Sequence, residues 1–263
     1  MMATRTLLAA ILLALCSAAQ AQMTWPKGRQ AAIALTYDDA LHSQLKFVVP
    51  QLAAAHLKGT FFLEGNITPA EMLLWRKVQG AGHELGNHSI YHPCPRAMLP
   101  DRTQYFTENY DVAHMVAEIA VMNDILFGID GQQSRTYSVP CSQTLVGGVD
   151  YLDGLRHSGL IKYVRNGGDQ YKSVITDFTA LDRFNVPSFG PVDHPDGAQL
   201  IAYAERVRAA HGLGVFQFHG VGGDYLEVSA QAHQQLIEYL AKHPDIWVGR
   251  FQDVMDYVSA RSR

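Results

Sequence analysis

The sequence has few charged residues and no cluster of basic ones. Charged residues make up 17% of the 263 residues, and 21 Lys and Arg stand against 25 Asp and Glu, which gives a formal net charge of -4. Nucleic acids require a basic face, so we expect no nucleic-acid partner. Because 48% of the residues are hydrophobic, the chain can still form an ordinary globular core.

Long apolar stretches are also scarce. Near the N-terminus, Arg5 precedes an apolar run over 7–15, and small residues around Ala21 form a cleavage site. This pattern is typical of a secretory signal, and its apolar run is shorter than the roughly 20 residues of a membrane span. We expect no later stretch to approach that length. The sequence therefore predicts a signal peptide over 1–21, one domain over 22–263, and a secreted or periplasmic protein without a membrane span.

Cysteines are few. Cys16 would leave with the signal peptide, whereas Cys94 and Cys141 would remain in an oxidising compartment, where an even pair can form a disulfide. Histidines, in contrast, number 12. The sequence leaves the oligomeric state open.

Strand-like and helix-like segments alternate along the whole chain. Strands are predicted over 31–37, 59–64, 83–88, 135–140, 162–166, 214–219 and 246–251. Helices are predicted over 43–56, 69–80, 111–127, 147–158, 197–211, 229–242 and 252–260. This alternation predicts an α/β fold with a parallel sheet, either open and doubly wound or closed into a barrel. Both place their chemistry at the C-terminal ends of the strands.

Five titratable side chains follow predicted strands. They are Asp38, Asp39, His88, His92 and His219. Two imidazoles and one carboxylate suit Zn²⁺ or a similar divalent ion, and three protein ligands leave a position open for a catalytic water. Each residue alone has a simpler role, Asp39 as a helix cap and each histidine as a hydrogen-bonded loop or core residue. Their joint occurrence at strand ends favours a metal site.

The adjacent pair Asp38 and Asp39 sets a geometric condition. Successive side chains of a strand point to opposite sides, so both carboxylates face one site only if the strand begins to turn at Asp39. The small residue Ala40 permits such a turn. One carboxylate would then bind the ion, and its neighbour would remove a proton from water.

Four segments resemble motifs of the polysaccharide deacetylase family, the carbohydrate esterases of family 4 with a NodB homology domain. They are LTYDDA, GTFFLEG, GHELGNHSIYH and GVFQFHG, and they extend over essentially the whole predicted domain. The resemblance implies a distorted (β/α)7 barrel. It also implies a hydrolase that removes N- or O-linked acetyl groups from an oligo- or polysaccharide and releases acetate.

The resemblance also implies a role for each of the five residues. Asp38 would be the general base and His219 the general acid, and the metal ligands would be Asp39, His88 and His92. The expected metal is Zn²⁺, with Co²⁺ or Ni²⁺ as alternatives. A backbone N–H just after the fourth strand would help to stabilise the oxyanion of the tetrahedral intermediate.

The chain departs from the family pattern after the fourth strand. The family commonly has Arg-Pro-Pro-Tyr there, whereas this chain has SVPC, with Ser138 in place of the arginine that steadies the catalytic aspartate. Arg165 lies at the end of the fifth predicted strand. We hypothesise that Arg165 orients Asp38 instead; the alternative is a surface arginine.

Other candidates follow from the same comparison. Cys94 lies just after His92, and Cys141 takes the family's tyrosine position, so the resemblance implies a Cys94–Cys141 disulfide that joins two loops at the site. Tyr91 is a candidate for stacking on a sugar ring. Asp224, in the glycine-rich turn after the last motif, either contacts substrate or lies in a solvent loop.

Two other functions stay open. The missing arginine would fit a carbohydrate-binding relative that has lost catalysis. The same site could also hydrolyse another C–N or ester bond on a small molecule, which a narrow, closed pocket would favour.

Overall fold

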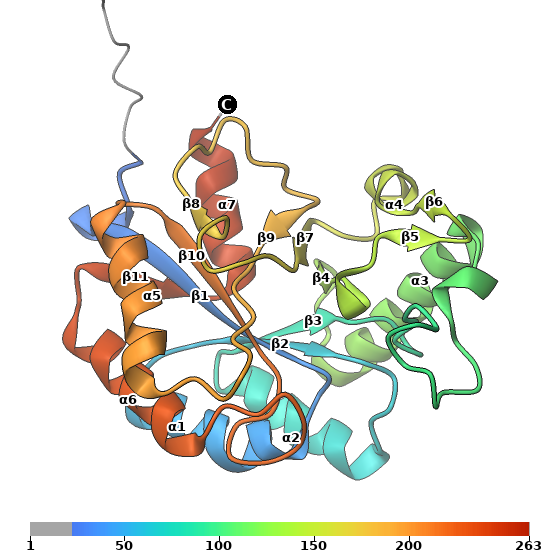
Figure 1. The fold of residues 1–263 in the computed structure, drawn as a ribbon, viewed down its shortest axis with the longest axis horizontal. Coiled ribbons are helices and arrows are strands. Elements are labelled where there is room, and N and C mark those ends of the chain that lie inside the picture. The colour runs from blue at the N-terminus through green and yellow to red at the C-terminus, as the bar shows by residue number, and fades with distance from the viewer. Residues whose placement is uncertain (1–22, 263) are drawn as a thin grey trace, which may run out of the picture.

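The computed structural model of the protein describes residues 23–262. The predicted signal peptide lies outside the described residues, and the division into a signal and one mature domain stays a prediction. The described part is an α/β fold in which a curled sheet is surrounded by helices (Figure 1).

The strands are β1 (Ala31–Asp38), β2 (Thr60–Leu63), β3 (Glu84–Asn87), β4 (Thr136–Ser138), β5 (Leu145–Val146), β6 (Val149–Asp150), β7 (Tyr163–Asn166), β8 (Val174–Ile175), β9 (Val186–Pro187), β10 (Leu213–Phe218) and β11 (Ile246–Gly249). The helices are α1 (Val49–Ala54), α2 (Pro69–Gly80), α3 (Val112–Asp130), α4 (Leu152–Ser158), α5 (Gly197–Ala209), α6 (Ala230–Lys242) and α7 (Phe251–Arg261). A π-helical turn over Gln44–Val48 precedes α1.

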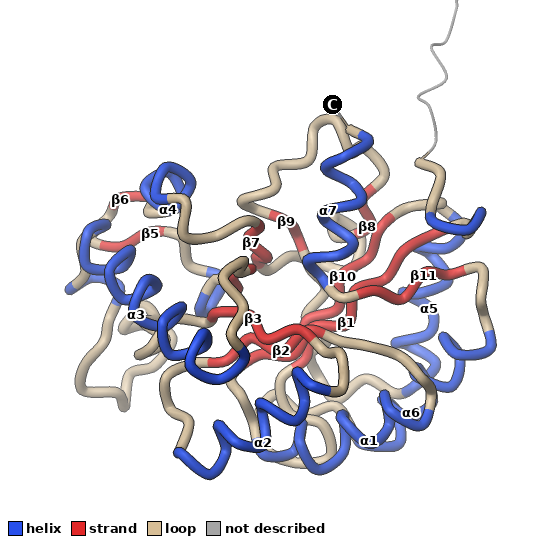
Figure 2. Tube along the Cα trace, turned by 180° about the vertical axis from the view of Figure 1, so that it is seen from behind, coloured by secondary structure: helices blue, strands red, loops and turns tan. Residues whose placement is uncertain are grey.

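The main sheet closes on itself. Parallel strands run in the order β10-β1-β2-β3-β4-β7-β9, and Phe189, just after β9, bridges to Phe216 of β10. β11 pairs with Ala31–Ala34 and β2 with Thr36–Asp38, so these two strands share one edge of β1. Figure 2 shows the strands wrapped around a common interior with helices outside. The predicted distorted (β/α)7 barrel is confirmed.

Strand β1 illustrates how the sequence positions the site. All eight of its residues are buried, as expected for a parallel strand covered on both faces. Ala32 and Ala34 pack with Phe62 and Val215 in one core cluster. Leu35 and the residues two positions before and after it in β1 pack with the helices in another core cluster. Because side chains alternate, Asp38 lies on the same face as Ala32 and Ala34, at the C-terminal end of the barrel.

Helix α3 is more apolar than we expected of any segment after the signal. By length and composition alone it could cross a membrane, and 33% of its most apolar window is buried. Met115, Ile119 and Met122 lie on its buried face, and the helix contacts β3, α2 and α4. Core helices of soluble proteins pass the same test, so α3 is weak evidence for a membrane span.

The predicted helix over 147–158 was wrong at its start. Residues 145–150 form the β5–β6 hairpin, and α4 begins only at Leu152. Gly147 and Gly148 take left-handed conformations in the hairpin turn, with φ of 55° and 82°. Strands β8 and β9 were not predicted, because two-residue strands carry no periodic pattern.

Candidate active site and metal centre

Strand β1 ends in a turn that brings two neighbouring carboxylates to one side. Asp39 and Ala40 adopt left-handed backbone conformations, with φ of 74° and 55°. The N–H of Asp39 donates to the carbonyl oxygen of Phe62 at 3.1 Å. Such conformations are costly for residues other than glycine and cluster at functional sites. The predicted turn at Asp39 is confirmed.

Asp39, His88 and His92 bring one oxygen and two ring nitrogens together. Oδ1 of Asp39 lies 3.1 Å from Nε2 of His88 and 3.4 Å from Nε2 of His92. One ligand atom from each residue lies within 4.8 Å of the others. Nδ1 of His88 is 2.8 Å from the carbonyl oxygen of Ser138, so we assign the ring proton to Nδ1. Nε2 then presents a lone pair to the cluster.

The cluster has the chemistry of a divalent cation site. Oδ1 of Asp39 is buried. Because the ring proton of His88 is on Nδ1, this oxygen accepts no hydrogen bond from residues 23–262. Leaving a buried acceptor unsatisfied costs about 1–3 kcal/mol, and more for a charged group. A cation between Asp39, His88 and His92 would satisfy this oxygen, and the donor set suits Zn²⁺, Co²⁺ or Ni²⁺. These residues therefore fit a divalent metal.

The charges in the cluster are strongly coupled. Burial raises the pKa of Asp39; when His88 is protonated on both ring nitrogens, its hydrogen bond to Asp39 and its charge, together with the charges of His92 and His219, bring this pKa below its ordinary value. Burial lowers the pKa of His88, and the carboxylates of Asp38 and Asp39 raise it above its ordinary value. A bound divalent cation would supply positive charge in place of the extra proton on the His88 imidazolium. We therefore expect metal binding to release protons.

Asp38 pairs with Arg165 of β7. Nη2 of Arg165 contacts both Oδ2 of Asp38 and the hydroxyl of Ser138, and the arginine side chain is 0% exposed. Gln217 of β10 donates from Nε2 to the same Asp38 oxygen at 3.2 Å. Nη1 of Arg165 is held by the hydroxyl of Ser188 at 3.3 Å. Arg165 is therefore no surface residue, and its guanidinium lies where the hypothesis requires it.

The guanidinium keeps Asp38 ionised. Burial raises the pKa of Asp38, but the charges of Arg165, His88 and His219 bring it below its ordinary value. Asp38 is then a carboxylate at neutral pH and can accept a proton. Its Oδ2 atom lies 3.9 Å from Nε2 of His88, so the acceptor stands beside the cation site.

His219 follows β10 and faces both carboxylates. Its Nε2 atom lies 3.9 Å from Oδ2 of Asp38 and 3.8 Å from Oδ2 of Asp39. Its carbonyl oxygen accepts a hydrogen bond from Nε2 of Gln44 at 3.1 Å, which fixes the backbone. The side chain is 18% exposed, so the ring reaches the cavity described below.

The predicted disulfide between Cys94 and Cys141 is confirmed, with Cα atoms 5.7 Å apart. It joins the loop that carries His92 to the loop after β4. Because the two sulfurs are bonded to each other, they are not ligands for the cation.

Cys141 also brings a backbone donor to the site. The N–H of Val139 donates to the carbonyl oxygen of Arg165, and Pro140 has no N–H. Cys141 therefore supplies the next N–H after β4. It has a left-handed φ of 51° and lines the same cavity as the carboxylates.

One cavity of about 700 Å³ contains these groups. This volume is typical of a small-molecule pocket. The predicted site residues that line it are Asp38, Asp39, His88, His92, Cys141 and His219. The structure thus brings together the five residues selected at strand ends, and their catalytic and ligand roles stay predictions.

Sequence reasoning missed two further residues of this cavity. Tyr225 donates its hydroxyl hydrogen bond to Oδ2 of Asp39 at 2.9 Å, which leaves Oδ1 turned toward the imidazoles. Glu64 follows β2, and burial, followed by the charge of Asp39, raises its pKa to about 7. Glu64 directly follows β2, so the rule that selected His88 and His219 could have found it, whereas Tyr225 lies further along the loop after β10.

Two predicted contacts lie elsewhere. Asp224 accepts the backbone N–H of Ser43 at 2.8 Å, which fixes the turn before α1, and it does not line the cavity; its contact with substrate stays a prediction. Tyr91 stacks on Tyr105, with ring centroids 4.1 Å apart, and lines a separate cavity of about 310 Å³. Arg102 and Glu64 line both this smaller cavity and the main one.

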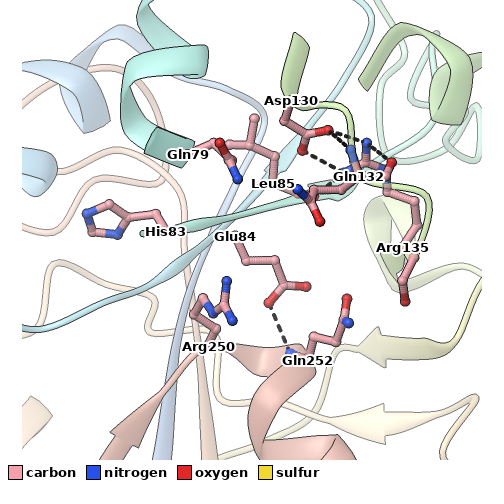
Figure 3. A pocket seen from close by; sticks show the side chains of 10 residues that line it. Gln79, His83, Glu84, Leu85, Asp130, Gln132, Arg135, Arg250 and Gln252 are labelled. Carbon is pink, nitrogen blue, oxygen red and sulfur yellow. Dashed lines mark hydrogen bonds and ion pairs between the residues drawn. The ribbon is translucent and has the colours of Figure 1, made fainter. Parts of the chain in front are cut away.

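Figure 3 shows a further polar cavity, of about 200 Å³, which is lined by Glu84 at the start of β3 and so lies at the N-terminal end of the strands. Glu84, the first residue of β3, accepts hydrogen bonds from the hydroxyls of Thr60 and Thr136 and from the N–H of Gln252. Thr60 and Thr136 begin β2 and β4. This carboxyl therefore joins the starts of three neighbouring strands to helix α7.

Comparison with known proteins finds similarity to one family. Residues 26–148 match the sequence model described as polysaccharide deacetylase. Over 113 residues, 43% of this chain, the sequence is 26% identical to the peptidoglycan-N-acetylmuramic acid deacetylase of Bacillus subtilis. The chain spans at most 38% of the length of the first curated relatives it matches.

Solved structures share the fold at low identity. A family 4 acetyl xylan esterase from Clostridium thermocellum is 15% identical with a TM-score of 0.57, and the match covers 88% of this chain and 96% of that one. A carbohydrate esterase family 4 pseudoenzyme from Bacillus anthracis is 18% identical with a TM-score of 0.54, with 86% and 66% covered. These similarities show the fold, and the family contains both enzymes and pseudoenzymes.

Proposed function

Because the chain belongs to the polysaccharide deacetylase family, whose members form carbohydrate esterase family 4, we propose that it hydrolyses acetyl groups on a carbohydrate. The products are acetate and a free amine or hydroxyl. One observation carries the proposal: an ionised carboxylate, Asp38, stands beside the cation cluster of Asp39, His88 and His92 in one cavity. A general base next to a cation site suits the hydrolysis of an acyl group.

Asp38 is the general base of this proposal. It takes a proton from the attacking water, and Arg165 with Gln217 holds its carboxylate in place. Since Arg165 stabilises the charged form of Asp38, it is a positioning residue that keeps the base available at neutral pH.

Asp39, His88 and His92 are the residues that would hold a divalent cation, Zn²⁺ in the first place or Co²⁺ or Ni²⁺. Such an ion lowers the pKa of a water molecule and polarises a carbonyl group. Tyr225 fixes the orientation of Asp39 through Oδ2. His88 is oriented in turn by the carbonyl oxygen of Ser138.

Two groups complete the reaction. The N–H of Cys141 donates a hydrogen bond to the developing oxyanion, and the disulfide to Cys94 keeps this donor in position. Nε2 of His219 gives a proton to the leaving nitrogen or oxygen, after which acetate is released. All of these groups reach the same cavity.

We further propose that the protein is exported, because the N-terminal sequence predicts a signal peptide and the disulfide suits an oxidising compartment. Its substrate is an acetylated oligo- or polysaccharide. Binding a sugar alone requires neither the base Asp38 nor the acid His219, and their presence favours an enzyme over a non-catalytic relative.

The test is acetate release from N-acetylated chitin oligosaccharides, peptidoglycan fragments and O-acetylated xylan, with and without a chelator. We expect activity on one class, loss with the chelator and recovery with added Zn²⁺, Co²⁺ or Ni²⁺. Activity indifferent to the chelator would contradict the metal role, and full activity of Asp38→Asn would contradict the base. Hydrolysis of simple amides or esters but of no acetylated sugar would favour the small-molecule hydrolase.

A further inference from the structure

The mouth of the catalytic cavity carries exposed aliphatic side chains. Met98, Leu99, Val192 and Leu226 line the cavity and are 56%, 37%, 66% and 58% exposed. They belong to separate loops, one after β3, one after β9 and one after β10. We call these four residues the aliphatic rim. Exposed apolar side chains gathered around one cavity are typical of a binding site.

The loop that carries Leu226 is held in a defined conformation. Leu226 itself has a left-handed φ of 47°, which is uncommon for a leucine. The N–H of Gly220 donates to the carbonyl oxygen of Tyr225 at 3.0 Å, and the N–H of Val228 donates to that of Gly220 at 2.9 Å. Asp224 binds the N–H of Ser43 at 2.8 Å. The chain therefore holds Leu226 at the cavity mouth in spite of backbone strain.

The loop with Met98 and Leu99 is fixed as well. The N–H of Arg102 donates to the carbonyl oxygen of Leu99 at 3.1 Å, and its guanidinium donates to that of His92 at 2.7 Å. The rim is thus connected directly to a residue of the cation cluster. The rim and the carboxylates line the same cavity.

The chemistry of the rim argues against sugar hydroxyls as its ligand. Aliphatic side chains offer no hydrogen bonds, so a hydroxyl placed against them would lose those it makes with water. Tyr225, the aromatic residue beside the rim, is 53% exposed, but its hydroxyl donates to Asp39 and is therefore not free to donate to a sugar hydroxyl. The floor of the cavity, in contrast, is polar and charged.

We propose that the aliphatic rim binds an aliphatic chain on the substrate, so that the preferred substrate is an amphiphilic acylated sugar. The chain is either an acyl group longer than acetyl or the aglycone of an acetylated glycoside. The inference rests on the proposed function only for the bond that is cleaved. The binding of the chain is independent of turnover.

The experiment compares two ligand series on the metal-loaded protein. One series is the methyl, butyl and octyl glycosides of N-acetylglucosamine below their micellar concentrations; the other is glucosamine with N-acetyl, N-butyryl and N-hexanoyl groups. Dissociation constants are measured by calorimetry, and product release is measured in parallel. Each fully buried methylene should tighten binding about fourfold, so we expect at least a tenfold gain along one series. A gain in affinity along the alkyl glycosides identifies the chain as the aglycone, and a gain along the N-acyl series identifies it as the acyl group.

Variants assign the gain to the rim. Val192→Ser with Leu226→Asn removes two exposed aliphatic chains, and Asn tolerates the left-handed backbone at residue 226. We expect this variant to lose the chain-length dependence. Leu73→Gln is the matched control, because Leu73 is 57% exposed on α2 and does not line the cavity; it should keep the dependence.

The outcomes separate this inference from the proposed function. Equal binding along both series, or chain-length dependence that survives in the rim variant, would overturn the inference while leaving deacetylation intact. A wild-type dimer that the rim variant abolishes would overturn it too, because the rim would then be an interface between copies. Chain-length dependence without hydrolysis of any ligand would support the inference and contradict the proposed function.

Discussion

The two ends of the barrel each hold a buried carboxylate in a polar cluster, and the two carboxylates are bonded differently. At the C-terminal end, Asp39 Oδ1 faces two imidazole nitrogens and accepts no hydrogen bond within the described part of the chain. At the N-terminal end, Glu84 accepts hydrogen bonds from the hydroxyls of Thr60 and Thr136 and from a backbone N–H. One end is incomplete without a ligand, and the other is complete.

The pKa directions express the same difference. Burial raises the pKa of both acids, yet the neighbouring histidines bring that of Asp39 below its ordinary value, whereas the hydrogen bonds to Glu84 leave its pKa above it. Asp39 is thus charged and fits the cation that we propose. Glu84 is arranged to join strands. An unmet acceptor among converging lone pairs indicates a ligand site more strongly than burial or a pKa shift does.

The strongest test of this comparison exchanges each carboxyl for its amide. Asp39→Asn should lower metal content by at least tenfold and kcat/KM by about 10⁴-fold, because the cation loses its charged ligand. Metal content is measured by elemental analysis and activity by acetate release. Glu84→Gln is the matched control and should keep both. Equal metal loss in the two variants would remove the distinction between the two ends.

The disulfide stabilises the C-terminal end. Cys94 and Cys141 are 47 residues apart, and cross-linking a loop of this length contributes about 4 kcal/mol of unfolding free energy by chain entropy. Replacing both cysteines by alanine should therefore lower the urea midpoint markedly. Reductant should destabilise the wild type and leave the double variant unchanged; sensitivity of the double variant would point to another cause.

The Asp38–Arg165 pair tests the base without touching the cation cluster. In Arg165→Met, Asp38 stays buried but loses the charge of the guanidinium. The pKa of Asp38 should therefore rise, and the acidic limb of the pH profile of kcat/KM should move to higher pH. At neutral pH we expect kcat/KM to fall about 10²-fold. Arg165→Lys should recover part of this, and metal content should not change. An unshifted acidic limb would contradict the positioning role.

The smallest expected effect concerns the N-terminal end. Because the folded pKa of Glu84 lies above its unfolded value, the folded state holds this proton more tightly. The stabilisation is present below the unfolded pKa and is lost as pH rises through the folded pKa. Wild-type stability should therefore fall more between pH 5 and 8 than that of Glu84→Gln, by at most about 1.4 kcal/mol for each unit by which the pKa is raised. Parallel urea curves at the two pH values would rule this out.

Much of the architecture could be predicted from the sequence. The strand over 31–37 is confirmed as β1 to within one residue, and the helix over 69–80 is confirmed as α2, because apolar periodicity and the N-terminal proline both mark it. The hairpin over 145–150 was missed although two glycines between β-branched residues indicated a turn. Strand β9 was missed because pairing with β7, rather than its own sequence, makes it a strand.

The residues of the site also fall into those that could be predicted from the sequence and those that could not. Residues directly after predicted strands, such as Asp39 and His88, were predictable because parallel strands end at one edge. Tyr225 was not selected, because its loop reads as a solvent turn and its path back to Asp39 depends on hydrogen bonds to residues distant in sequence. The contact between Arg165 and Asp38 was open between two alternatives, since sequence alone does not say which strands become neighbours.

Strand pairing makes the substitution at Ser138 understandable. Ser138 of β4 and Arg165 of β7 are direct partners in the sheet, so they are separated by one strand spacing of about 4.8 Å. A guanidinium on a long side chain reaches Asp38 from either strand when the facing residue is small. Compared with the family pattern, the positive charge at Asp38 therefore comes from the neighbouring strand of the sheet, 27 residues further along the chain.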